Sequence, residues 1–153
     1  MDAVFWCSNE SSYVATLWGV DFIFADLRWA QEAPFTSSAH TKETIWPDGR
    51  IEGLTLVATE RLVIRDYELP IMVESVMSLD PASTLRMIFE DDDWGSTISF
   101  ESGSDVSLGG ALELMFANDT NPADLVGTTF DLFDWDGAVV TGRFDEEVVT
   151  QWQ

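Results

Sequence analysis

A spaced recurrence of apolar runs constrains the fold of this chain more than any other feature. Ser78-Leu79 followed by Leu85–Phe89 (L-R-M-I-F) recurs as Ser107-Leu108 followed by Leu112–Phe116 (L-E-L-M-F). The offset is 107 − 78 = 29 for the first pair and 112 − 85 = 27 for the second, so the second copy has a shorter turn. Spacing in the twenties is typical of stacked coils, in which each coil buries its inward side chains against its neighbours.

Two further pairs of runs have similar spacing. Leu62–Ile64 precedes Leu85 by 85 − 62 = 23, and Ile71–Met77 precedes Thr97–Phe100 by 97 − 71 = 26. Short apolar runs between Gly, Pro, Asn and Asp are typical of strands and turns, so the sequence predicts an all-β chain. The strand candidates are Leu54–Ala58, Leu62–Arg65, Ile71–Met77, Thr84–Phe89, Thr97–Phe100, Ala111–Phe116, Thr128–Phe133 and Val139–Phe144.

The recurrence favours a parallel β-helix, or β-solenoid, segment. Regular short strands with frequent turns also suit an antiparallel β-sandwich, which stays open as the alternative. In the solenoid, one set of alternating apolar residues forms the inward ladder: Leu62, Ile64, Leu85, Met87, Phe89, Leu112, Leu114, Phe116, Phe130 and Leu132.

The first 46 residues differ from the rest, and we divide the chain into an irregular N-terminal segment or cap (1–46) and a solenoid region (47–153), which we expect to be truncated at its C-terminus. Thr16–Trp29 fits helical and alternating periodicity alike and leans towards strand. The polar composition of Gln31–Lys42 predicts a loop, and Trp46–Gly49 (W-P-D-G) predicts a turn.

The charge is large and uneven. The net charge is −21: Met1–Phe89 holds 13 acids and 6 bases, whereas Glu90–Gln153 holds 15 acids and one base, Arg143. Such a field repels nucleic acids and anionic membranes and leaves cations, basic proteins and neutral glycans as partners. An acidic mimic of nucleic acid that inhibits nucleic-acid-binding proteins is a third functional option. Against it, the acids cluster at turns and alternate with core residues, as they would on any solvated strand face.

Two groups of aspartates are candidate calcium ligands, because calcium prefers carboxylate oxygens. The sequence lacks the spaced ligands and closing Glu of an EF-hand loop, and Asp-Gly is a common hairpin turn, so solvated turns are the competing interpretation. No other cofactor is expected. The two groups are Asp91, Asp92 and Asp93, and Asp131, Asp134 and Asp136.

Trp94 is the candidate glycan-binding residue. It follows three aspartates and precedes Gly95, so a turn could expose its indole for stacking on a sugar. The chain has one histidine, His40, and one cysteine, Cys7, and no serine elbow, so a nucleophilic triad is not indicated. We therefore expect no catalytic residues and no enzyme. A single cysteine also excludes an intrachain disulfide.

The stretches Gly109–Leu114, Gly127–Gly137 and Thr141–Asp145 resemble the C-terminal part of large secreted bacterial proteins built from autotransporter-like β-solenoid repeats. These proteins often carry a PEP-CTERM sorting signal or a dockerin module. Leu62–Phe100, with its D-Y-E-L-P and W-G-S-T-I-S-F segments, is similar to the preceding coils of that family. Met1–Trp46 departs from the repeat pattern.

The resemblance implies an extracellular or cell-surface location and a non-catalytic structural or adhesive role. Its partners would be cell-surface or matrix components, glycans among them, and coil ends could support self-association. The chain itself shows no signal peptide and no membrane-inserting segment: no base precedes Arg28, and Asp21 interrupts the apolar run Val14–Phe24. A calcium-dependent or carbohydrate-binding β-sandwich module is the alternative function.

Overall fold

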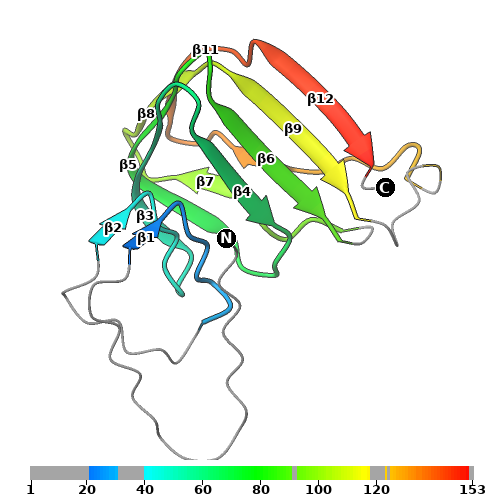
Figure 1. The fold of residues 1–153 in the computed structure, drawn as a ribbon, viewed down its shortest axis with the longest axis horizontal. Helices are drawn as coiled ribbons and strands as arrows, with labels where there is room; N and C mark the ends of the chain where they lie inside the picture. The colour runs from blue at the N-terminus through cyan, green and yellow to red at the C-terminus, as the bar shows by residue number, and fades with distance from the viewer. Residues whose placement is uncertain (1–20, 31–39, 91–92, 118–122, 124, 152–153) are drawn as a thin grey trace, which may run out of the picture.

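The chain folds into parallel β-sheets in its computed structural model (Figure 1). The structure describes residues 21–30, 40–90, 93–117, 123 and 125–151. Within them there is no helix, and every pair of named strands is parallel. The predicted all-β class is confirmed, and the antiparallel pairing of the sandwich alternative is wrong.

The larger sheet is organised around β5 (Ile71–Leu79), whose two halves have different partners on one side. Ile71–Val73 pairs with β7 and Val76–Ser78 pairs with β8, while β3 lies along the opposite side of β5. β10 and β11 then extend the sheet beyond β7 and β8. The remaining strands are β3 (Arg50–Leu56), β7 (Ile98–Phe100), β8 (Asp105–Leu108), β10 (Phe133–Asp134) and β11 (Val139–Gly142).

The second sheet contains four strands in sequence order, which lie side by side in Figure 1. Leu62, Leu85 and Leu112 occupy equivalent positions in the first three, so the predicted alignments of Leu62 with Leu85 and of Leu85 with Leu112 are confirmed. The chain visits the two sheets alternately from β3 to the last strand. The four strands are β4 (Arg61–Arg65), β6 (Thr84–Phe89), β9 (Ala111–Phe116) and β12 (Glu146–Gln151).

A short parallel pair precedes these sheets. β1 (Asp21–Ile23) pairs with β2 (His40–Lys42), and an isolated bridge joins Asp26 to Ile45. The strand expected within Thr16–Trp29 is therefore present at β1, whereas β2 occupies the end of the segment predicted as a loop. In the predicted turn, the Gly49 N–H donates to the Trp46 carbonyl over 2.9 Å.

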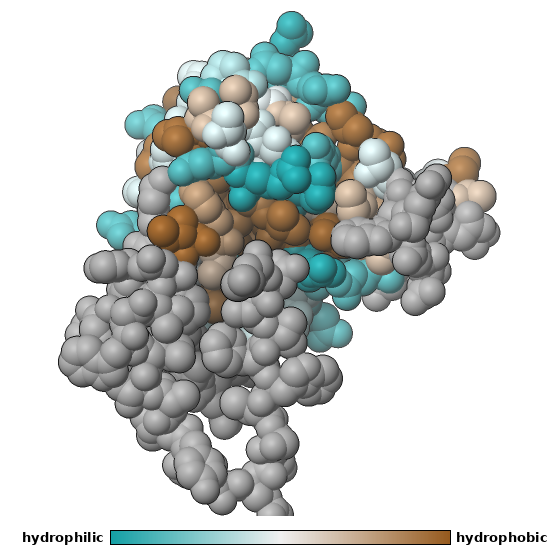
Figure 2. Space-filling view, viewed as in Figure 1, coloured by the Kyte–Doolittle hydropathy of each residue, from teal (hydrophilic) through white to brown (hydrophobic). Residues whose placement is uncertain are grey.

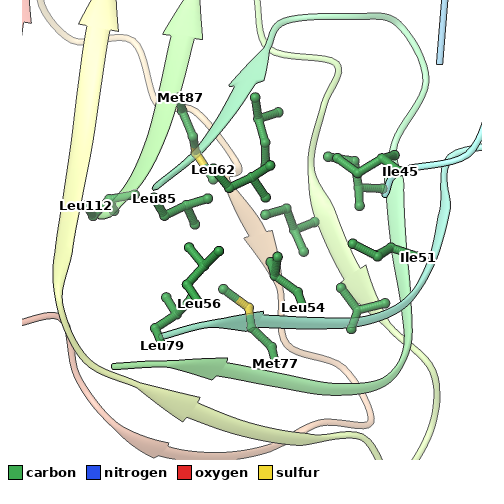
Figure 3. Packing of buried hydrophobic residues seen from close by; sticks show 14 of the residues in the cluster. Ile45, Ile51, Leu54, Leu56, Leu62, Met77, Leu79, Leu85, Met87 and Leu112 are labelled. Carbon is green, nitrogen blue, oxygen red and sulfur yellow. The ribbon is translucent and has the colours of Figure 1, made fainter. Parts of the chain in front are cut away.

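The hydrophobic core lies between the two sheets (Figure 3). In β4 and β7, for example, alternate residues are buried, because side chains alternate between the faces of a strand. Seven of the ten predicted ladder residues are buried, and Leu114, Phe130 and Leu132 are partly buried and packed against the core. Ile45, which precedes both sheets in sequence, belongs to the same cluster.

Two strand predictions in the two large sheets need correction, and two strands there were not predicted. Thr128–Phe133 forms a ladder only at its last residue, where β10 meets Ile98. Ile71 pairs with Ile98 and not with Thr97, an offset of 27 in place of 26. Two strands were missed: β8 is short, and the run E-E-V-V-T-Q of β12 carries two charges and no alternation.

Two corner glycines permit close approach between successive passes of the chain. Gly49 has φ +83°, and a Cβ there would lie 2.3 Å from the Pro70 carbonyl oxygen. Gly142 has φ +75°, and its Cβ would lie 2.3 Å from the Leu108 carbonyl oxygen. Both glycines therefore avoid a steric clash as well as an unfavourable backbone conformation.

Candidate functional site

A buried arginine joins the N-terminal segment to the sheets. Arg28 has a relative exposure of 1%. Its Nε–H donates to Asp26 Oδ1 over 2.9 Å and its Nη2–H donates to Asp26 Oδ2 over 2.7 Å, a two-pronged pairing that fixes the guanidinium plane. The pair is local, and it directs the remaining donors towards the rest of the molecule.

Those remaining donors bind backbone carbonyls and a buried hydroxyl. Arg28 donates to the carbonyls of Leu69 and Arg65 and, over 2.9 Å, to Ser96 Oγ. Ser96 Oγ also accepts the Tyr67 N–H over 2.7 Å. A buried charge is tolerated when such partners satisfy it, so this cluster is a structural tie across three segments of chain.

A shallow polar groove of about 320 Å³ lies beside β3. It forms where the register with β5 shifts between Ile51 and Gly53, and Glu43, Glu52 and Ser75 are among its lining residues. Glu43 Oε2 accepts the Thr55 N–H over 2.8 Å, and Ser75 Oγ donates to the Glu52 carbonyl. The Glu43 carboxylate in the groove therefore binds a backbone donor of β3.

Trp94 does not present its ring to solvent. Its relative exposure is 6%, and its ring centroid lies 4.5 Å from that of Phe89 in the core. The expected exposure is wrong because the inward side of this turn faces Phe89, and a ring buried there cannot stack on a glycan. The indole N–H is buried without a hydrogen-bond partner in the described structure.

Among the described residues, the predicted calcium ligands do not form a recognisable centre. Asp91 and Asp92 lie outside the described residues, and Asp93 accepts the Trp94 N–H over 2.8 Å. Asp134 Oδ1 accepts the Asp136 N–H over 3.1 Å, as in a simple turn, while the Asp131 carbonyl accepts a bond from Thr97. Within the described ranges, no group of three or more His, Cys, Asp or Glu residues could hold a metal ion. Calcium binding stays a prediction.

Two outer strands, β11 of the larger sheet and β12 of the four-stranded sheet, together form what we call the C-terminal edge, and most of their residues are exposed. β11 pairs with β8 and β12 pairs with β9, and neither has a second partner among the described strands (Figure 1). Val149 is 65% exposed and Val139 is 57% exposed. Figure 2 shows hydrophilic residues bordering exposed apolar ones on the visible face.

At this edge, the column of buried leucines across the four-stranded sheet ends in a charged residue. Leu62, Leu85 and Leu112 are buried one beside the other, and the next residue in their column is Glu147. Among the described residues, no ion pair joins Glu147 or its neighbour Glu146 to a base. The edge therefore combines unpaired backbone, exposed valines and two unneutralised carboxylates.

Arg28, Glu43 and Glu147 were not singled out as functional candidates from the sequence. The one available signal for Arg28 was its isolation: it is the first base of the chain and follows Asp26 by two residues. Glu147 could have been found by extending the column Leu62, Leu85, Leu112 by one further step. Glu43 carried no local signal, since its partner is twelve residues away.

In comparisons with known proteins, no family model matches the sequence, and neither a curated protein nor a solved structure shows significant similarity to it. The described part of the chain contains no helix long and apolar enough to cross a membrane.

Proposed function

We propose that this chain is a parallel β-solenoid segment that acts as a non-catalytic structural or adhesive module outside the cell or on its surface. The observation that carries the proposal is the column of equivalent residues Leu62, Leu85 and Leu112 in three successive strands. Each pass through the two sheets buries its inward residues against the passes beside it. This arrangement is the one that makes solenoids useful as spacers and as extended surfaces.

The polar contacts of the described residues support a structural role. Arg28 and Glu43 both bind backbone groups, and Arg86 pairs with Glu113 of the adjacent strand over 2.6 Å. Outside these contacts, the acids lie mainly on exposed strand faces and turns, where they keep the surface hydrated and soluble. We infer that the molecule works through its surface and not through a reaction at a cleft.

The resemblance to secreted autotransporter-like repeat proteins supports the location and the class of partner. In this proposal the partners are cell-surface or matrix components, including glycans. Residues 1–46 would close one end of the solenoid, and Ile45 already contributes to the shared core.

Protease treatment of intact cells of the source organism tests the location. An exposed module will be digested without lysis, and its disappearance is followed with an antibody against the chain. A cytoplasmic protein probed in parallel must survive. Protection of the chain until lysis would contradict the proposed location.

Adhesion is tested with beads coated with the folded chain and presented to cells and to purified matrix components. Beads coated with the heat-denatured chain are the matched control, because they carry the same charge without the fold. Retention of only the folded beads is expected. Equal retention of both would mean that charge alone explains the binding.

A further inference from the structure

We propose that the C-terminal edge binds an extended basic segment of a partner protein, which adds to β12 as a further strand. This inference names the partner of the proposed adhesive module and in that sense rests on the proposed function. The mode is β-augmentation, in which backbone hydrogen bonds supply affinity and alternate side chains supply specificity.

The backbone of β12 offers such a template. The strand is six residues long and bonds to β9 along its whole length, from Glu146 opposite Ala111 to Gln151 opposite Phe116. It has no second strand partner among the residues that the structure describes. An outer strand presents a row of backbone donors and acceptors that can pair with another chain.

The side chains of β12 select for positive charge. Glu146 and Glu147 are both exposed and point to opposite faces of the sheet, because neighbouring residues of a strand alternate. Glu147 continues the column Leu62, Leu85, Leu112. An apolar residue placed beside it would bury an unpaired carboxylate, whereas a lysine or arginine there would neutralise it.

The apolar contribution comes two residues further along the strand. Val149 shares its column with Leu114, Met87 and Ile64, and it is the most exposed member of that column. An apolar partner residue opposite Val149 would cover it. The fitting segment therefore has basic residues opposite Glu146 and Glu147 and an apolar residue opposite Val149.

A second copy of this chain fits the edge less well. Stacking β4 of another molecule on β12 in the same columns would place Arg61 beside Glu146 but Leu62 beside Glu147. In addition, residues near that end already bond to the N-terminal segment: Arg28 binds the Arg65 carbonyl and Glu43 binds the Thr55 N–H. Two C-terminal edges would repel each other through their carboxylates.

The test is a titration of the full chain with a labelled peptide of the same length as β12. Its sequence is Lys-Arg-Thr-Val-Thr-Thr, and binding is measured by fluorescence anisotropy. We expect saturable binding and slower hydrogen exchange of β12 amides. A peptide with glutamates in place of the bases should bind about tenfold or more weakly, because like charges across a strand pair repel. A peptide with proline in place of its first threonine should also lose binding, since the N–H of that residue would face the Glu147 carbonyl and proline lacks this ladder donor.

Charge reversal locates the site. The variant E146K/E147K should lose binding, whereas E52K/E68K, which changes two exposed carboxylates elsewhere by the same charge, should retain it. Equal loss in both variants, or undiminished binding of the proline peptide, would show a diffuse charge effect and overturn the proposal. Absence of binding would overturn it too, without bearing on the protease experiment that tests location. Dimerisation of the free chain through β12 would assign the edge to a second copy and also overturn the proposal.

Discussion

The two ends of the paired sheets differ in how they treat the outermost strands. At the end formed by β3 and β4, side chains from the preceding segment bond to the backbone: Glu43 to the Thr55 N–H and Arg28 to the Arg65 carbonyl. At the end formed by β11 and β12, the described residues supply no such contacts, and Val139 and Val149 are exposed. At one end the chain itself binds two backbone groups of the outer strands, and the other end presents its edge.

A parallel sheet edge can therefore be protected in two physical ways. The first end uses specific hydrogen bonds and a buried ion pair, which fix one arrangement. The second relies on carboxylates, Glu146 and Glu147, which discourage a further strand unless it carries bases. Removing a contact should therefore damage the first end, whereas a comparable change at the second should alter association more than stability.

Replacing Arg28 should have the largest effect. R28M removes the guanidinium bonds to the Asp26 carboxylate and to the carbonyls of Leu69 and Arg65, and breaking a buried pair typically costs about 3–5 kcal/mol. Because Asp26 is partly exposed, we expect a loss of about 3 kcal/mol in the free energy of unfolding, measured in urea. R143M at the exposed opposite end is the control, and equal losses in both variants would erase the contrast between the ends.

The two corner glycines give a matched comparison. G49A forces a residue with Cβ into a positive-φ conformation at a buried corner, and we expect a loss of about 2–3 kcal/mol. G142A creates the same contact distance on an outer strand that can shift, so about 1 kcal/mol is expected. Thermal and urea unfolding of the two variants measure the difference. A larger loss for G142A would mean that β11 is the more rigid end.

Glu43 should contribute less than Gly49. E43A removes the acceptor of the Thr55 N–H, and leaving such a donor unsatisfied typically costs about 1–2 kcal/mol. Hydrogen exchange at the Thr55 amide should accelerate with it, which distinguishes loss of this bond from a general softening. E52A, in the same groove but with its side chain exposed, is the control, and an unchanged Thr55 amide in E43A would contradict the assignment.

The smallest effect on stability is expected at Glu147, and its sign is opposite. E147L continues the leucine column and should raise the free energy of unfolding by about 1 kcal/mol or less, because the new side chain stays partly exposed. It should also promote association, visible as concentration-dependent mass in light scattering. E146L, on the other face, is the control. If E147L stays monomeric, the carboxylate is not what keeps the edge unpaired.

The sequence was sufficient for the central ladder. Leu85–Phe89 and Leu112–Phe116 share an apolar pattern with a constant offset, and parallel pairing in register is the arrangement that buries both. β10 was overestimated because the pattern of Thr128–Phe133 is strand-like, while a ladder partner exists only at Ile98 and Ser99. Pattern alone does not show where a neighbouring strand ends.

The contacts of the candidate site were harder to predict because they connect distant residues. Arg28 binds Ser96, which is 68 positions away, and no local pattern encodes such a pairing. Trp94 was expected at the surface from its aspartate neighbours, yet burial depended on Phe89 lying beneath it. Charged neighbours in the sequence predict a turn. The direction of the aromatic side chain in that turn depends on the packing of the adjacent strand.

The lengthening of successive passes has a consequence for engineering. From Leu62 to Leu85, Leu112 and Glu147, the steps are 85 − 62 = 23, 112 − 85 = 27 and 147 − 112 = 35, yet the residues remain aligned. Alignment is thus independent of contour length between the strands. Foreign sequence grafted at a turn such as Gly127, where a Cβ would meet nothing within 4 Å, should be displayed without shifting the ladders on either side. The alignment of the paired strands is thus fixed, while the length and sequence of the segments that connect them can change.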